Sequence, residues 1–88
     1  MKSLPRIAVF MGGKSPEHDI SVLSGTEVFQ HIPRTQWAPF AVHITRDGAW
    51  RFSDDNEVYG HSLSLADGLQ ELLKRKPAAV FPLLHGAY

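Results

Sequence analysis

Three ionisable side chains lie close together directly after the first apolar segment of the chain. Lys14, Glu17 and His18 follow the apolar run Ile7–Met11 and the glycine pair Gly12–Gly13. A carboxylate accepts hydrogen bonds and pairs with an ammonium group, while an imidazole gains or loses a proton near neutral pH. A turn that served only for packing would not need all three groups within five positions. We therefore expect the chemistry of this chain to lie at this turn.

A second candidate, His85, follows the last apolar run at 78–84. In open parallel sheets, ligands bind beyond the carboxyl ends of the strands. With right-handed crossovers and neighbouring first and last strands, Glu17 and His85 would face one cleft. Two plainer interpretations stay open from the residues alone: Glu17 could only complement the positive start of a helix, and His85 could be an ordinary loop residue.

Small residues around the turn have expected supporting roles. Gly12 and Gly13 would allow close backbone approach and unusual φ angles. The Ser21 hydroxyl could bond to nearby backbone and brace the turn, and Ser15 could be the N-cap of the following helix. We expect these roles to be structural even where the site is real.

The elements that must position these residues follow from the spacing of apolar side chains. We expect strands at 7–11, 37–45 and 78–84, a helix from 19 or 21 to 32, and a hairpin at Asp47–Gly48 leading into 49–52. Five leucines predict a second amphipathic helix that ends at 74–76, although Gly68 interrupts it: Leu63, Leu65, Leu69, Leu72 and Leu73. The first helix would bury Val22, Gly25, Thr26, Phe29 and Ile32. Pro82 is unexpected in a central strand. The predicted fold is α/β, a small Rossmann-like open parallel sheet with flanking helices and a short antiparallel hairpin.

Composition excludes several classes of protein. The 88 residues suffice for one small domain, and nine basic residues balance nine acidic ones, so we expect no nucleic-acid partner. The chain has no cysteine and no apolar run near the ~18 residues of a membrane span, so we expect no membrane partner and a cytoplasmic location. The five histidines lack metal-type spacing, and the sequence around Lys14 fits no phosphate-loop motif, so we expect no bound metal and no nucleotide.

Two motifs resemble those of a known family. Segment 12–21, GGKSPEHDIS, is similar to the G-G-x-S-x-E-x-x-[VI]-S signature that opens D-alanine-D-alanine ligases. Segment 81–86, FPLLHG, is similar to their F-P-x-L-H-G segment, and 42–50 resembles their strand and hairpin with I-x-x-D-G-x-W. The motifs occur in the right order, and the resemblance extends over nearly the whole chain.

The resemblance implies an ATP-grasp ligase that activates one D-alanine as an acyl phosphate and joins it to a second, making the dipeptide for peptidoglycan, the cell wall and cell shape. Residues 1–88 would be its amino-terminal domain. The regions that hold ATP and magnesium have no counterpart here, so the segment alone should bind neither cofactor and be inactive. Its partners would be D-alanine, the remaining ATP-grasp domains and, as in many such ligases, a second copy in a homodimer.

The resemblance also assigns roles to individual residues. Glu17 matches the family glutamate that binds the ammonium of the first D-alanine, and His85 matches the histidine near the substrate carboxylate and the transferred phosphate. Both would then be catalytic and substrate-binding, with Ser21 in a supporting, substrate-binding role. The alternatives of another class are a stand-alone small-molecule-binding module and a dimerisation module of the same fold.

Overall fold

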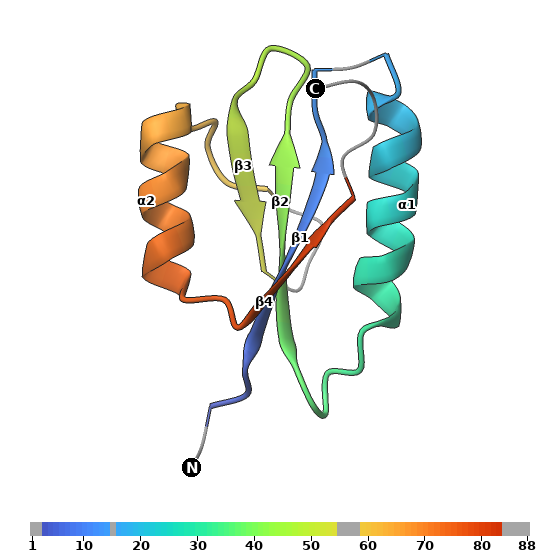
Figure 1. The fold of residues 1–88 in the computed structure, drawn as a ribbon, viewed down its shortest axis with the longest axis vertical. Helices are drawn as coiled ribbons and strands as arrows, with labels where there is room; N and C mark the ends of the chain where they lie inside the picture. Colours follow the sequence, from blue (N-terminus) through green and yellow to red (C-terminus); the bar gives the residue numbers. More distant parts are fainter. Residues whose placement is uncertain (1–2, 15, 55–58, 84–88) are drawn as a thin grey trace.

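Four strands form one mixed sheet with a helix on each face (Figure 1). The computed structural model describes residues 3–14, 16–54 and 59–83. Its elements, in chain order, are β1 (Arg6–Gly12), α1 (His18–His31), β2 (Ala38–Ile44), β3 (Trp50–Ser53), α2 (Leu65–Arg75) and β4 (Ala79–Pro82). This is the predicted α/β fold.

The strand order within these residues is β3-β2-β1-β4, which places β1 in the interior of the sheet. β1 runs parallel to both β2 and β4, so that Val9 lies opposite Ala41 on one side and Phe81 on the other. β2 and β3 are antiparallel and are joined by the predicted hairpin, in which Gly48 has a φ of 90°. The expected adjacency of the first and last strands is confirmed, and their carboxyl ends share one edge.

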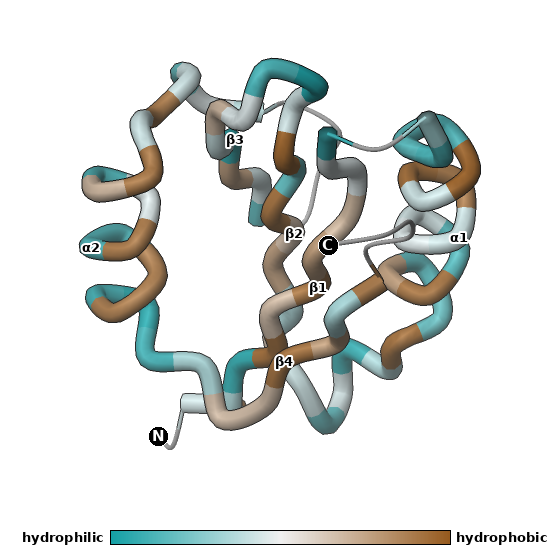
Figure 2. The backbone as a smooth tube through the Cα atoms, turned by 45° about the horizontal axis from the view of Figure 1, so that its top comes forward, coloured by the Kyte–Doolittle hydropathy of each residue, from teal (hydrophilic) through white to brown (hydrophobic). Residues whose placement is uncertain are grey.

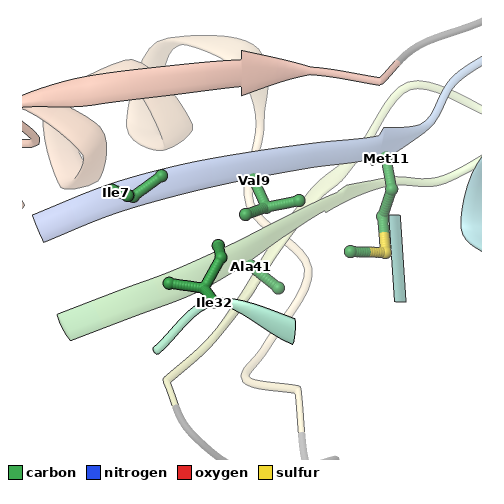
Figure 3. Packing of buried hydrophobic residues seen from close by; sticks show 5 residues of the cluster. All are labelled: Ile7, Val9, Met11, Ile32 and Ala41. Atoms are coloured by element: carbon green, nitrogen blue, oxygen red, sulfur yellow. The ribbon is translucent and has the colours of Figure 1, made fainter. Parts of the chain in front are cut away.

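β1 is buried on both faces, which explains its unbroken apolar sequence. Ile7, Val9 and Met11 point to the α1 side, where they pack with Ile32 and Ala41 (Figure 3). The alternate residues of the sheet, including Ala8, Phe40 and Val42, form a second cluster on the α2 side. The two clusters hold the strand ends, and therefore the turn after β1, in fixed positions.

α1 lies close to the sheet because Gly25 has no side chain. A Cβ added at Gly25 would lie 2.6 Å from the Cβ of Met11. Val22 and Phe29 pack on the same cluster, as the sequence pattern predicts, whereas Thr26 is exposed. Close approach at this glycine brings the first turn of α1 beside the ends of β1 and β2.

α2 differs from the sequence expectation in the face that it buries. Ser64 caps its start by accepting a hydrogen bond from the Asp67 N–H, and Leu63 lies outside the helix, in a bridge with Trp50. Leu65, Leu69 and Leu73, predicted to lie on the buried face, are 59%, 45% and 73% exposed. The apolar bands on α2 are visible in Figure 2.

Trp50 is the physical reason for this difference. A Cβ at Gly68 would lie 2.7 Å from the Trp50 ring, so the glycine face of α2 is the one that fits against the tryptophan. That contact turns Leu72 inward and leaves the three other leucines outward. The glycine that interrupts the helical pattern therefore selects the packing face.

β4 lies at an edge of the sheet formed by the described residues, and all four of its residues are exposed. An edge position accommodates Pro82, because proline has no N–H to donate to a neighbouring strand. Val80 and Phe81 leave apolar surface there. In the described ranges, neither helix is long and apolar enough to cross a bilayer.

Candidate functional site

The glycine pair after β1 makes a tight turn against the end of β2. Gly12 and Gly13 have φ angles of 92° and 106°, a region in which other residues are strained. A Cβ at Gly12 would lie 2.3 Å from the carbonyl oxygen of Ile44, and the Gly13 N–H donates to that same oxygen at 2.8 Å. Glycine is therefore required at position 12 for two separate reasons, the backbone angle and the lack of space.

Ser21 ties three parts of the chain together from a fully buried position on α1. Its hydroxyl oxygen accepts a hydrogen bond from the Gly12 N–H at 2.9 Å, and its O–H donates to the carbonyl of Leu83. The Leu83 N–H in turn donates to the Phe10 carbonyl at 3.0 Å. The hydroxyl thus braces the glycine turn against the segment that follows β4.

Glu17, not Ser15 as the sequence suggested, occupies the N-cap position of α1, and it makes no side-chain capping bond. Its carbonyl accepts from the Ser21 N–H at 3.0 Å, and the residue is exposed at the sheet edge where β1 ends. Ser15 and His85 lie outside the described residues. The bond between Ser21 and Leu83 brings the chain leading to His85 beside the Glu17 turn, while the shared cleft stays a prediction.

Two histidines meet next to this turn. The Nε2 atoms of His18, which begins α1, and His43, on β2, lie 2.9 Å apart, and the ring centroids are 5.0 Å apart. The His18 side chain is only 11% exposed. Both rings pack over Gly12, because a Cβ there would lie 2.8 Å from His43 and 3.2 Å from His18. The pair forms one wall of the glycine turn.

Charged groups lead from the histidine pair toward the hairpin. His18 Nδ1 lies 3.0 Å from a carboxylate oxygen of Asp19, which also bonds to Arg46 at 2.9 Å. These hydrogen bonds, from His18 first and then Arg46, lower the pKa of Asp19. Burial lowers the pKa of His43, and the nearby charges of His18 and Arg51 lower it further. The structure therefore favours an ionised Asp19 and a neutral His43.

The sequence did not predict the histidine pair, because the five histidines lack metal-type spacing. The usable signal was topological: His18 starts the helix after β1, and His43 pairs in register with Met11 near the end of the parallel neighbour. The parts of the chain that the structure describes hold no group of three or more potential metal-ligating side chains. The expectation of no bound metal stays a prediction.

Lys14 is exposed and extends over the hairpin rather than toward the turn. A Cβ at Gly48 would lie 2.7 Å from the Lys14 Cε. A separate cavity of about 610 Å³ lies between α1 and the sheet, and its lining includes Met11, Phe29, His43 and Tyr59. Glu17 and Ser21 are not among the residues that line this cavity, so the cavity and the Glu17 turn are separate features.

Comparisons with known proteins agree on one family. Residues 6–88 match the family model described as "D-ala D-ala ligase N-terminus". The D-alanine--D-alanine ligase of Staphylococcus carnosus is 38% identical over 92 residues, which cover 91% of this chain and 26% of the relative. The D-alanine--D-alanine ligase A of Mesorhizobium japonicum is 42% identical over 58 residues, covering 66% of this chain and 16% of the relative.

Solved structures give the same result for the fold. The D-alanine-D-alanine ligase from Coxiella burnetii superposes with a TM-score of 0.71 at 22% identity, covering 96% of this chain and 29% of that one. The VanG D-Ala:D-Ser ligase from Enterococcus faecalis gives 0.68 at 25% identity, covering 96% and 30%. This chain therefore spans less than a third of the length of each of these relatives.

Proposed function

Because the chain belongs to the D-ala D-ala ligase N-terminus family, we propose that it acts as the amino-terminal, substrate-side domain of an ATP-dependent ligase that joins two D-alanines. The product would be the dipeptide precursor of peptidoglycan, made in the cytoplasm. Residues 1–88 form this domain. The much greater length of the relatives supports a division in which other regions supply the rest of the active site.

The observation that carries the proposal is the braced turn with Glu17 at the shared edge of β1 and β4. A carboxylate there is suited to the ammonium of the first D-alanine through charge-assisted hydrogen bonds. Ser21 fixes both the glycine turn and Leu83, so it would set the distance between Glu17 and the segment of His85. His85 would donate a hydrogen bond to charge that develops on the acyl phosphate. A direct contact between Ser21 and substrate is a weaker proposal, because its hydroxyl already serves the backbone.

ATP and magnesium would bind to regions beyond this segment. Lys14 extends over the hairpin, so its position gives no support for phosphate binding at the glycine turn. Magnesium chemistry would neutralise the phosphates and assist acyl-phosphate formation. The same amino-terminal fold occurs in a D-Ala:D-Ser ligase, so this fold is compatible with a second substrate other than D-alanine.

Exposed apolar side chains support the proposed partners. Leu65, Leu69 and Leu73 on α2, with Val80 and Phe81 on β4, would pack against the remaining ATP-grasp domains. On α1, Ile20 and Leu23 are also exposed, at 57% and 70%, which favours a homodimer through that helix as a further proposal. Equilibrium sedimentation of the complete ligase tests this, and a strict monomer at high concentration would contradict it.

The central test compares Glu17→Gln with Glu27→Gln in the complete ligase. Loss of a charge-assisted hydrogen bond costs about 1.5–3 kcal/mol, so we expect Glu17→Gln to weaken D-alanine binding by roughly 10- to 150-fold. Glu27 is an exposed carboxylate elsewhere on α1, near His31, and its variant should behave as the unaltered enzyme. Equal KM values for the two variants would show that Glu17 does not bind D-alanine.

Two simpler measurements separate the alternatives. The 88-residue chain should release no phosphate from ATP with D-alanine. The intact mass of the native gene product should exceed the 9.8 kDa of this chain. A native product of 9.8 kDa that binds D-alanine saturably would instead support a stand-alone binding module.

A further inference from the structure

The histidine pair beside the turn has room for one hydrogen between its facing nitrogens. With 2.9 Å between the two Nε2 atoms, one nitrogen must donate and the other accept. The ionised Asp19 carboxylate is only an acceptor, so His18 carries a hydrogen on Nδ1. In the neutral pair, His43 therefore donates through Nε2 and His18 accepts.

A first added proton is compatible with this arrangement. The added proton would go to Nδ1 of His43 while the central hydrogen passes to His18, so His18 as an imidazolium would donate through Nδ1 to Asp19 and through Nε2 to His43. The direction of the central hydrogen bond reverses, but the two rings do not have to move apart. Both donors of the charged ring are satisfied.

A second proton is not compatible with it. Two imidazolium rings would point N–H groups at each other across 2.9 Å. Among the described residues, groups with a printed interaction with the pair or with Asp19 include Arg46 in the hairpin, Arg51 on β3 and Tyr59. Of the carboxylates, Asp19 bonds to His18 but also to Arg46, and Glu17 directly precedes His18 in the chain. The rings must separate when both are charged.

Separation of the rings would be transmitted to the turn. His18 is the first residue of α1 and directly follows Glu17, and both rings pack over Gly12. Gly12 is in turn bonded to Ser21, which holds Leu83. The imidazoles thus lie at the centre of the contacts that place Glu17.

We propose that His18 and His43 are a positioning pair. With one hydrogen between their facing nitrogens, they hold the Glu17 turn in its ligand-binding arrangement. When both rings are charged they separate, and the turn loses that arrangement. The link to ligand binding rests on the proposed role of Glu17. The link between the pair and the turn stands on the contacts alone. The consequence is a loss of D-alanine affinity on the acid side that follows the second protonation of the pair.

NMR titration of the 88-residue chain tests the link to the turn. We expect the ring signals of His43 and the backbone amide signals of Gly12, Gly13 and Glu17 to change together, with one midpoint below pH 6.5. In His43→Gln, the side-chain amide still donates to His18 but cannot take up a proton, so this joint transition should vanish while the spectrum at neutral pH is retained. His61→Gln, at an exposed histidine, is the matched control and should keep the transition.

The pH dependence of D-alanine KM in the complete ligase tests the link to function. We expect KM to rise several-fold on acidification with the midpoint of His43, and to stay flat over that range in His43→Gln. Turn amides that do not follow the His43 ring, or an unchanged transition in His43→Gln, would overturn the proposal. If Glu17→Gln leaves KM unaltered, the assignment of Glu17 fails, whereas the amide titration still decides whether the pair holds the turn.

Discussion

Replacing Ser21 by alanine removes one oxygen atom that serves two backbone groups. In the structure this hydroxyl accepts from the Gly12 N–H at 2.9 Å and donates to the Leu83 carbonyl, and the residue has no exposed surface. Each lost hydrogen bond costs about 0.5–1.5 kcal/mol, and a buried donor left without a partner raises the cost toward about 1–3 kcal/mol. We expect Ser21→Ala to lower the free energy of unfolding by about 2–3 kcal/mol, a large part of the stability of a domain of this size.

Ser24→Ala is the matched control for this change. Ser24 lies on the same helix, and its side chain makes no hydrogen bond to any described residue. The gain in helix propensity from serine to alanine, about 0.5 kcal/mol, is common to both variants and cancels in their difference. Urea unfolding followed by far-UV circular dichroism gives the two free energies, and hydrogen exchange of the Gly12 amide reports the local effect.

The outcome that refutes this reasoning is a difference of less than about 0.5 kcal/mol between the two variants, within the range of ordinary surface substitutions. Undiminished protection of the Gly12 amide in Ser21→Ala would contradict it independently. Either result would mean that the turn keeps its arrangement without the hydroxyl.

Three further predictions concern packing, pH and surface. Gly25→Ala should destabilise the domain by about 1–3 kcal/mol in urea unfolding despite its better helix propensity, because the added methyl group would lie 2.6 Å from the Met11 Cβ. The Arg6 guanidinium, 2.7 Å from Asp54, lowers the pKa of that carboxyl below 3.8, so its contribution to stability is present above pH 3.8 and is lost as the pH falls through the lowered value. Asp54→Asn should flatten this part of the acid unfolding curve, and an unchanged curve would contradict the pairing. Leu73→Gln, at a 73% exposed position, should change stability by no more than about 0.5 kcal/mol and reduce self-association of the isolated chain in sedimentation; a loss beyond that range would place Leu73 in the core.

The sequence by itself determined the elements and the place of the turn. The apolar run of β1, the glycine pair and the Asp47–Gly48 hairpin are local signals, because each depends on a few neighbouring residues and on backbone angles that only some residues adopt. Right-handed crossovers, together with the assumed adjacency of the first and last strands, predicted that the turns after β1 and β4 share one edge, and the strand order confirms that adjacency. The candidate site residues Glu17, Ser21 and His85 lie within the two family motifs, and their contacts with substrate stay predictions.

Tertiary structure alone decided which side chains meet. Periodicity predicted a leucine face for α2, but the helix packs its Gly68 face against the Trp50 ring, and Leu65 and Leu73 are exposed. The histidine pair joins residues 25 positions apart in the sequence, and its contact depends on the close approach of α1 at Gly25 and on the register between β1 and β2. Periodicity reports that a helix has an apolar side, whereas shape and space at particular contacts decide which side is buried and which polar groups come together.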